Sequence, residues 1–77
     1  MAEATPVQLI EFIVKSIVTQ PDDVTVHERD GGNLLELETH EDDRGRVIGR
    51  QGRVAKAMRA VLGASSAGAD CRLDIVD

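Results

Sequence analysis

The chain is predicted to form an α+β domain in which a three-stranded sheet packs against three helices, in the order helix, strand, strand, helix, helix, strand. Its 77 residues leave room for one small core, so we assign residues 1–77 to a single domain and expect residues 1–5 to be flexible. Apolar residues make up 42% of the chain, which indicates a folded protein. Their spacing changes from the period of a helix to the alternation of strands and then back again.

The first helix is predicted to begin near Pro6 and to end before Pro21. Thr5 and Gln8 have the spacing of a capping box, and proline suits the first helical position. One face is polar and the opposite face is apolar; the apolar residues are Ile10, Ile13, Val14 and Ile17. Phe12 lies close to the polar line, which leaves two alternatives. The helix is either seated deeply in the core or exposes an edge around Phe12 that contacts another protein.

Two strands follow, because the apolar period changes to two. In the first, Val24 and Val26 alternate with polar residues, and the second runs from Leu34 to Thr39. Between them, residues 30–33 read Asp-Gly-Gly-Asn, which are residue types that accept a positive φ. We therefore expect a tight antiparallel hairpin.

A short helix is predicted over residues 40–48, and it begins with acidic residues. Glu41, Asp42 and Asp43 would lie at its N-terminus, where the helix dipole favours negative charge. A divalent-cation site is the less favoured alternative, because consecutive helical side chains point in different directions. His27 and His40 have no ligand partners at a suitable spacing, so no metal site is expected.

The basic residues are concentrated in one segment, residues 44–59, which contains no acidic residue. They are Arg44, Arg46, Arg50, Arg53, Lys56 and Arg59. The whole chain has 9 basic and 14 acidic residues and a net charge of −5, so the remainder carries a net charge of −11. This sorting of charge indicates a local site for an anion on an otherwise acidic protein.

A break at Gly49-Arg50-Gln51-Gly52 interrupts this basic segment and joins two helices. The second of these helices is predicted to begin near Gly52 and to run to about Leu62. Its core-facing residues are Val54, Ala55, Met58, Val61 and Leu62, and Arg53, Lys56 and Arg59 line an adjacent flank. The glycines let a phosphate approach the main chain, and the following helix offers N–H groups to an anion.

The last predicted element is a third strand over residues 71–76. Cys71, Leu73 and Ile75 alternate there with Arg72, Asp74 and Val76. Cys71 is interpreted as a small apolar core residue rather than as a nucleophile. It is the only cysteine in the chain, so no disulfide supports the fold and a reducing, cytoplasmic environment is the simpler expectation.

The segment Val-Ile-Gly-Arg-Gln-Gly-Arg-Val, residues 47–54, resembles the signature of KH domains, in which an Ile-Gly-x-x-Gly loop joins two helices. The predicted order of elements is similar to the prokaryotic, type II arrangement. A KH domain of this size is most similar to the small bacterial KhpA (YlqC-type) RNA-binding proteins. The resemblance implies an RNA-binding site made of Arg46, Val47, Ile48, Gly49, Arg50, Gln51, Gly52, Arg53, Ala55 and Lys56.

Within that site, the resemblance implies that Arg50 and Gln51 face phosphates. Val47, Ile48 and Ala55 would line the apolar side of a narrow groove, with Leu35 or Leu37 opposite. Ala55 stands where KH domains often have isoleucine, which implies a shallower groove floor.

The function expected from these features is single-stranded RNA binding, as a small RNA chaperone or post-transcriptional regulator. The alternative is a protein-interaction or scaffold module that acts mainly through dimerisation. The resemblance also implies a homodimer or a hetero-complex with a larger Jag-type KH protein. An enzyme is not expected, because no nucleophile, base and orienting group can be assembled from this sequence. We expect no cofactor and no membrane segment.

Overall fold

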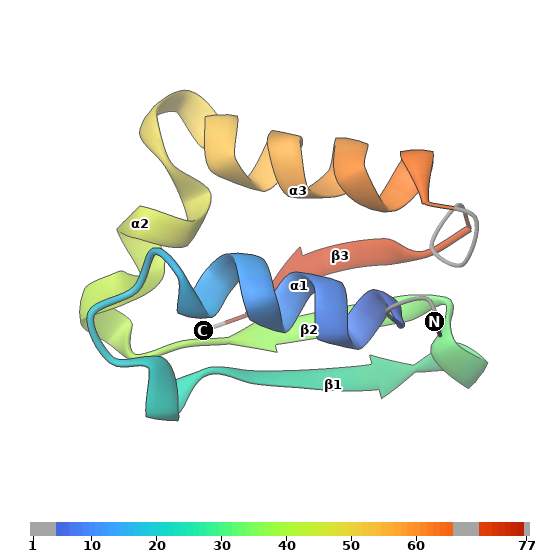
Figure 1. Ribbon diagram of the computed structural model, residues 1–77, viewed down its shortest axis with the longest axis horizontal. Coiled ribbons are helices and arrows are strands. Elements are labelled where there is room, and N and C mark those ends of the chain that lie inside the picture. Colours follow the sequence, from blue (N-terminus) through green and yellow to red (C-terminus); the bar gives the residue numbers. More distant parts are fainter. Residues whose placement is uncertain (1–4, 66–69, 77) are drawn as a thin grey trace.

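The computed structural model describes residues 5–65 and 70–76, and it confirms the predicted order of elements (Figure 1). The helices are α1 (Pro6–Lys15), α2 (Arg44–Ile48) and α3 (Arg53–Ala64). The strands are β1 (Thr25–Arg29), β2 (Leu34–Glu38) and β3 (Arg72–Ile75). The expected flexibility of the N-terminus stays a prediction for residues 1–4, which lie outside the described residues.

The sheet is mixed, with the strand order β1-β2-β3. Strands β1 and β2 are antiparallel, and Val26 lies opposite Leu37, so the predicted hairpin is confirmed. Its turn places Asp30, Gly31 and Gly32 at φ values of 54°, 66° and 96°. Strand β3 runs parallel to β2, because two helices intervene and return the chain to the end at which β2 began.

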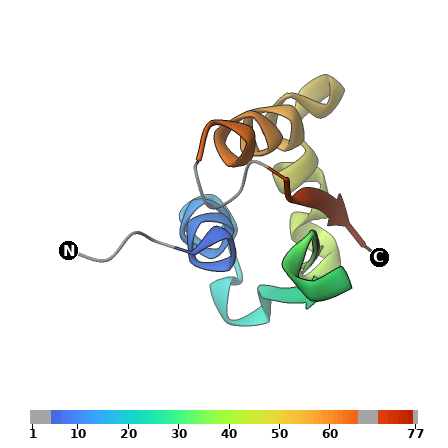
Figure 2. The ribbon, with the colours of Figure 1, turned by 90° about the vertical axis from the view of Figure 1, so that its right-hand side faces the viewer.

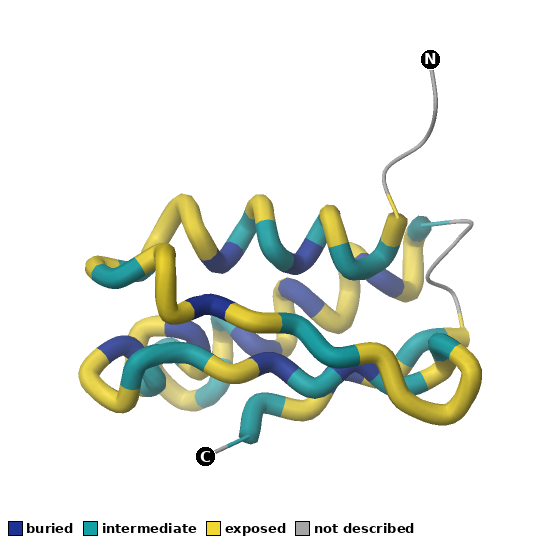
Figure 3. The backbone as a smooth tube through the Cα atoms, turned by 90° about the horizontal axis from the view of Figure 1, so that it is seen from below, coloured by how far each residue is buried: buried dark blue, intermediate teal, exposed yellow. Residues whose placement is uncertain are grey.

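The helices form one layer and the sheet forms the other. Figure 2 shows α1 and α3 side by side over the same face of the sheet. Buried positions recur along both helices and along β2 (Figure 3). The hydrophobic core consists of Ile10, Val14, Val24, Leu35, Leu37, Val47, Met58, Leu62 and Leu73. The opposite face of the sheet carries mostly charged side chains, including an ion pair between Arg29 Nε and Glu36 Oε1 at 2.6 Å.

Helix α1 begins as predicted but ends earlier. The capping box is present: Gln8 N–H donates to Thr5 Oγ1 at 3.1 Å, and Thr5 N–H donates to Gln8 Oε1 at 3.0 Å. The helix ends at Lys15, which is before Pro21 as predicted but short of Ile17, a residue of its predicted apolar face. The cause lies in the next segment, where the backbone N–H groups of Thr19 and Gln20 donate to the carboxylate of Asp43.

Three side chains that were expected to face the core are more exposed than predicted. Ile17, which was placed on the apolar face of the first helix, lies beyond the end of α1 and is 38% exposed. Val61 is 42% exposed, so the predicted core stripe of α3 is wrong at this position, although Met58 and Leu62 are buried. Cys71 precedes β3 and is half-buried, and its Sγ donates to the carbonyl of Gly32 at 3.1 Å. No helix in the described part of the chain combines the length and hydropathy of a membrane span.

Candidate nucleic-acid interface

The loop of residues 49–52 joins α2 to α3 at one end of the molecule (Figure 1). Its backbone is unusual at three of four positions. Gly49 has φ 77° and ψ 170°, Gln51 has φ 57°, and Gly52 has φ 74°. The first conformation is accessible almost only to glycine, and the other two lie in the left-handed region. The side chains of Arg50 and Gln51 are exposed at the tip of this loop.

The two glycines have different roles. A Cβ added at Gly49 would lie 2.6 Å from Val54 Cγ2 and 2.8 Å from the backbone nitrogen of Val54. A Cβ added at Gly52 would meet no atom within 4 Å. The absence of a side chain at Gly49 therefore allows the loop to pack against α3. The space above Gly52 is open, so a ligand can approach the main chain there.

A buried carboxylate anchors the N-terminus of α2. Asp43 is completely buried, and it accepts hydrogen bonds from Thr19 N–H at 3.0 Å, Thr19 Oγ1 at 2.8 Å and Gln20 N–H at 3.0 Å. The backbone N–H of Thr19 is the main cause that lowers the pKa of Asp43, although burial opposes it. Asp43 lies at the N-terminus of α2, as predicted, but its carboxylate makes no capping hydrogen bond to the N–H groups of this helix; it binds the backbone of residues 19 and 20 instead.

Most basic side chains around the loop are not neutralised by neighbouring acids. Arg46 Nε lies 3.6 Å from Asp43 Oδ1. Within residues 5–65 and 70–76, no carboxylate lies within 4.0 Å of the charged nitrogens of the next four basic residues. They are Arg50, Arg53, Lys56 and Arg59, and all four are exposed. The positive charge near the loop is therefore available to an anion from solution.

The apolar side chains of the predicted groove do not all reach the surface. Ile48 is 38% exposed beside the loop, whereas Val47 is 0% exposed and Ala55 is 4% exposed. Val47 and Ala55 therefore offer almost no exposed apolar surface, and their place in the RNA-binding site stays a prediction. Leu35 and Leu37 are likewise buried in the core, so the expectation that they lie opposite is wrong.

Strand β3 is the element that faces the basic flank of α3. The guanidinium of Arg59 reaches it, because Nε and Nη2 both donate to the carbonyl oxygen of Leu73, at 3.2 and 3.1 Å. Sequence alternation predicted this strand, but alternation does not show which strand lies at which edge of the sheet.

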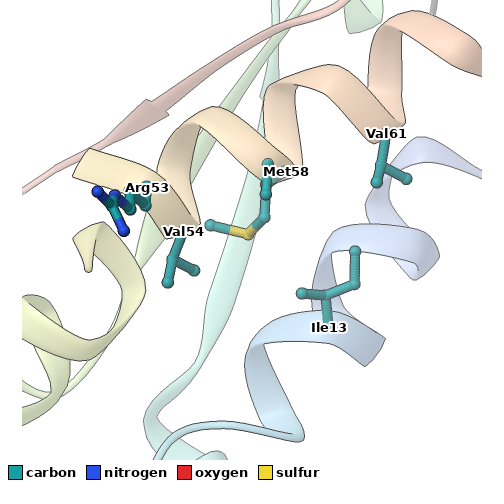
Figure 4. A pocket seen from close by; sticks show the side chains of 6 residues that line it. Ile13, Arg53, Val54, Met58 and Val61 are labelled. Atoms are coloured by element: carbon teal, nitrogen blue, oxygen red, sulfur yellow. The ribbon is translucent and has the colours of Figure 1, made fainter. Parts of the chain in front are cut away.

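The other flank of α3 faces α1 across an apolar hollow of about 270 Å³. It is lined by Ile13, Arg53, Val54, Ala57, Met58 and Val61. Figure 4 shows Val54, Met58 and Val61 of α3 on the side of Ile13 of α1, with Arg53 at the start of α3. Phe12 on α1 is 74% exposed, as the interaction alternative requires. Helix α3 thus faces α1 with a mainly apolar flank, to which Arg53 adds one charged side chain, and it contacts β3 through Arg59.

The described residues contain no group of three or more side chains arranged to hold a metal ion. Neither histidine belongs to such a group. Nδ1 of His40 accepts a hydrogen bond from the backbone N–H of Asp42 at 3.1 Å, and Nε2 of His27 lies 3.6 Å from a carboxylate oxygen of Glu38. These interactions give both histidines structural partners.

Comparisons with known proteins identify relatives that match most of this chain. The chain is 49% identical over 72 residues to the RNA-binding protein KhpA of Streptomyces coelicolor, covering 91% of this chain and 90% of that protein. It is 49% identical over 73 residues to RNA-binding protein KhpA of Halalkalibacterium halodurans, covering 90% and 96%. The corresponding protein of Mycobacterium bovis is 42% identical over 76 residues, covering 96% and 94%.

No solved structure matches this chain. The sequence pattern of the KhpA/KhpB KH domain matches residues 7–76, which include all three helices except Pro6 and all three strands. The chain therefore belongs to the KhpA/KhpB family of KH domains.

Proposed function

We propose that this chain binds single-stranded RNA through the loop of residues 49–52 and the basic flank of α3. The observation that supports the proposal most strongly is the group of exposed bases without acidic partners beside a loop with open space above Gly52. Relatives that are named RNA-binding proteins and match most of the chain give independent support.

In this proposal, an RNA phosphate approaches the main chain at Gly52, near the N-terminus of α3. Arg50 and Gln51 contact the phosphates on either side, and Lys56 adds positive charge further along the helix. The strand then passes between α3 and β3, with Ile48 offering an apolar contact to a base. Phe12 is the only aromatic residue and lies on α1, so bases do not stack on an aromatic platform at the loop.

A flexible single strand fits this charge distribution better than a rigid duplex. It can follow the basic segment and avoid the acidic remainder of the chain, which has a net charge of −11. The affinity of a site with few phosphate contacts is modest. Such binding suits a small cytoplasmic RNA chaperone or post-transcriptional regulator.

The salt dependence of binding tests the proposal. If about three or four phosphates are neutralised, log affinity for a short single-stranded RNA should fall against log salt concentration with a slope of roughly −2 to −3. Arg53→Ala and Lys56→Ala should each reduce the slope by less than one unit, because each removes at most one contact. Fluorescence anisotropy over a range of salt concentrations measures both quantities.

The matched control is Lys15→Ala, which removes one positive charge from α1 and should leave the slope unchanged. Duplex DNA of equal length should bind more weakly than the RNA. Binding that does not depend on salt, or that favours the duplex, contradicts the proposal.

A second proposed function is assembly through α1 and α3, and the observation that favours it is the 74% exposure of Phe12 on α1, the helix that also contributes Ile13 to the apolar hollow. The partner is a second copy or a larger KH protein. A charge at Phe12 would have to be buried on assembly, so Phe12→Glu should shift the protein to monomer or weaken the hetero-complex by at least about tenfold. Analytical ultracentrifugation measures this shift.

Thr25→Glu is the control for assembly, because it adds the same charge to the exposed outer face of the sheet. It should leave the association state unchanged. If folded Phe12→Glu protein assembles like the wild type, Phe12 has no part in an interface.

A further inference from the structure

Arg59 differs from Arg50, Arg53 and Lys56 because its guanidinium is bound to the main chain of another element. Both Nε and Nη2 donate to the carbonyl of Leu73 in β3, at 3.2 and 3.1 Å. No hydrogen bond from the side chains of Arg50, Arg53 or Lys56 to the backbone of another element is present within the described residues.

The Leu73 carbonyl, which accepts the hydrogen bonds from Arg59, lies on an edge strand of the sheet. Among the strands of residues 5–65 and 70–76, β3 lies at one edge of the sheet and pairs only with β2. The N–H groups of Arg72 and Val76 donate to β2 or its preceding residue, at 2.8 and 2.9 Å. Because alternate residues of a strand direct their backbone groups to opposite sides, the Leu73 carbonyl points away from β2. Arg59 therefore satisfies a polar group on the outer edge of β3.

The same bond fixes the distance between two elements. The Leu73 side chain is buried and 2% exposed, so its main chain is held to the core on one side and to Arg59 on the other. Arg59 comes from the basic flank of α3, and the contact thus links this flank directly to β3. Without it, the separation of α3 and β3 depends on apolar packing alone.

We propose that Arg59 is a positioning residue that sets the separation of α3 and β3 and does not contact phosphate. This inference rests on the proposed function, because these two elements are the walls between which the RNA strand passes. Arg59 then contributes to affinity through the shape of the site, whereas Lys56 contributes through charge. The two roles differ in their dependence on salt, since only phosphate contacts release counterions.

The test compares Arg59→Met with Lys56→Met. Each variant removes one charge from the same helix and keeps an apolar side chain. Arg59→Met should weaken binding of a short single-stranded RNA by about threefold to thirtyfold and leave the salt slope unchanged. Lys56→Met should reduce the slope by about 0.7. A reduction of the slope by Arg59→Met equal to that by Lys56→Met overturns the proposal, and so does unchanged affinity.

Amide hydrogen exchange of the RNA-free protein provides a second measurement. Exchange in β3 should be faster in Arg59→Met than in the wild type and unchanged in Lys56→Met. Arg59→Lys keeps a positive charge but offers one donor nitrogen in place of the two that bind Leu73, so it should give intermediate exchange and intermediate affinity. This variant is also the test if Arg59→Met does not fold. Unchanged exchange in both Arg59 variants overturns the proposed bridge. If the wild-type protein binds no RNA, the proposed function is wrong, and Arg59 has no positioning role in binding. Faster amide exchange of β3 in Arg59→Met would then still show that Arg59 links α3 to β3.

Discussion

Replacing Arg50 and Gln51 together with aspartate is expected to weaken single-stranded RNA binding by at least about tenfold, because two contacts with phosphate become repulsive. The fold should be retained, since both side chains are exposed and aspartate tolerates the left-handed conformation found at Gln51. The unfolding temperature should stay within about 4 °C of the wild type, which corresponds to less than about 1 kcal/mol. Fluorescence anisotropy and thermal unfolding followed by circular dichroism measure the two quantities.

A control of the same charge change separates a local contact from the net charge of the protein. Arg72→Asp combined with Asn33→Asp changes exposed residues at the start of β3 and just before β2, at the end of the sheet farther from the loop (Figure 1), and should reduce affinity much less. An equal loss in both double variants would show that only net charge matters. Unchanged affinity in the loop variant would exclude residues 50 and 51 from the site.

Gly49→Ala is expected to destabilise the domain strongly. The new Cβ would lie 2.6 Å from Val54 Cγ2 and 2.8 Å from the Val54 backbone nitrogen, so the loop or α3 must move. The backbone at φ 77° and ψ 170° also becomes strained for any residue with a side chain. Together these effects should lower the free energy of unfolding by about 3 kcal/mol or more, and the unfolding temperature by about 12 °C or more.

Gly52→Ala is the matched comparison, because a Cβ at Gly52 has open space around it. Only left-handed strain applies there, so the free energy of unfolding should fall by about 1–2 kcal/mol. Chemical denaturation of both variants gives the difference. Equal destabilisation would mean that the contact between Gly49 and Val54 has no special importance.

The order of elements could be predicted from the sequence because each element has a local signal. The capping box at Thr5 and the glycines of the hairpin are encoded by neighbouring residues, and both appear in the structure. The end of α1 has no such signal. It depends on Asp43, which binds the backbone of Thr19 across 24 positions of the sequence. Local periodicity contains no information about a bond between residues so distant in the chain.

The loop of the candidate site could be predicted from the sequence, but the contact between α3 and β3 beside it could not. The glycines and the acid-free segment identify the loop, but the sequence does not distinguish Gly49, which packs on Val54, from Gly52, which does not. The residue that bonds to β3 was also not predicted. Arg59 belongs to a run of similar bases, and only the parallel placement of β3 shows that its guanidinium has a backbone acceptor.

The burial of Asp43 couples folding to proton binding. Because its pKa is lowered in the folded chain, a proton binds this carboxyl more readily when the chain is unfolded. The stabilisation is fully present above its ordinary pKa of 3.8 and is lost as the pH falls through the lower value of the folded state. At low pH the backbone of residues 19 and 20 is therefore released from Asp43 at the start of α2. Helix α2, which precedes the loop of residues 49–52, then loses its link to the segment after α1.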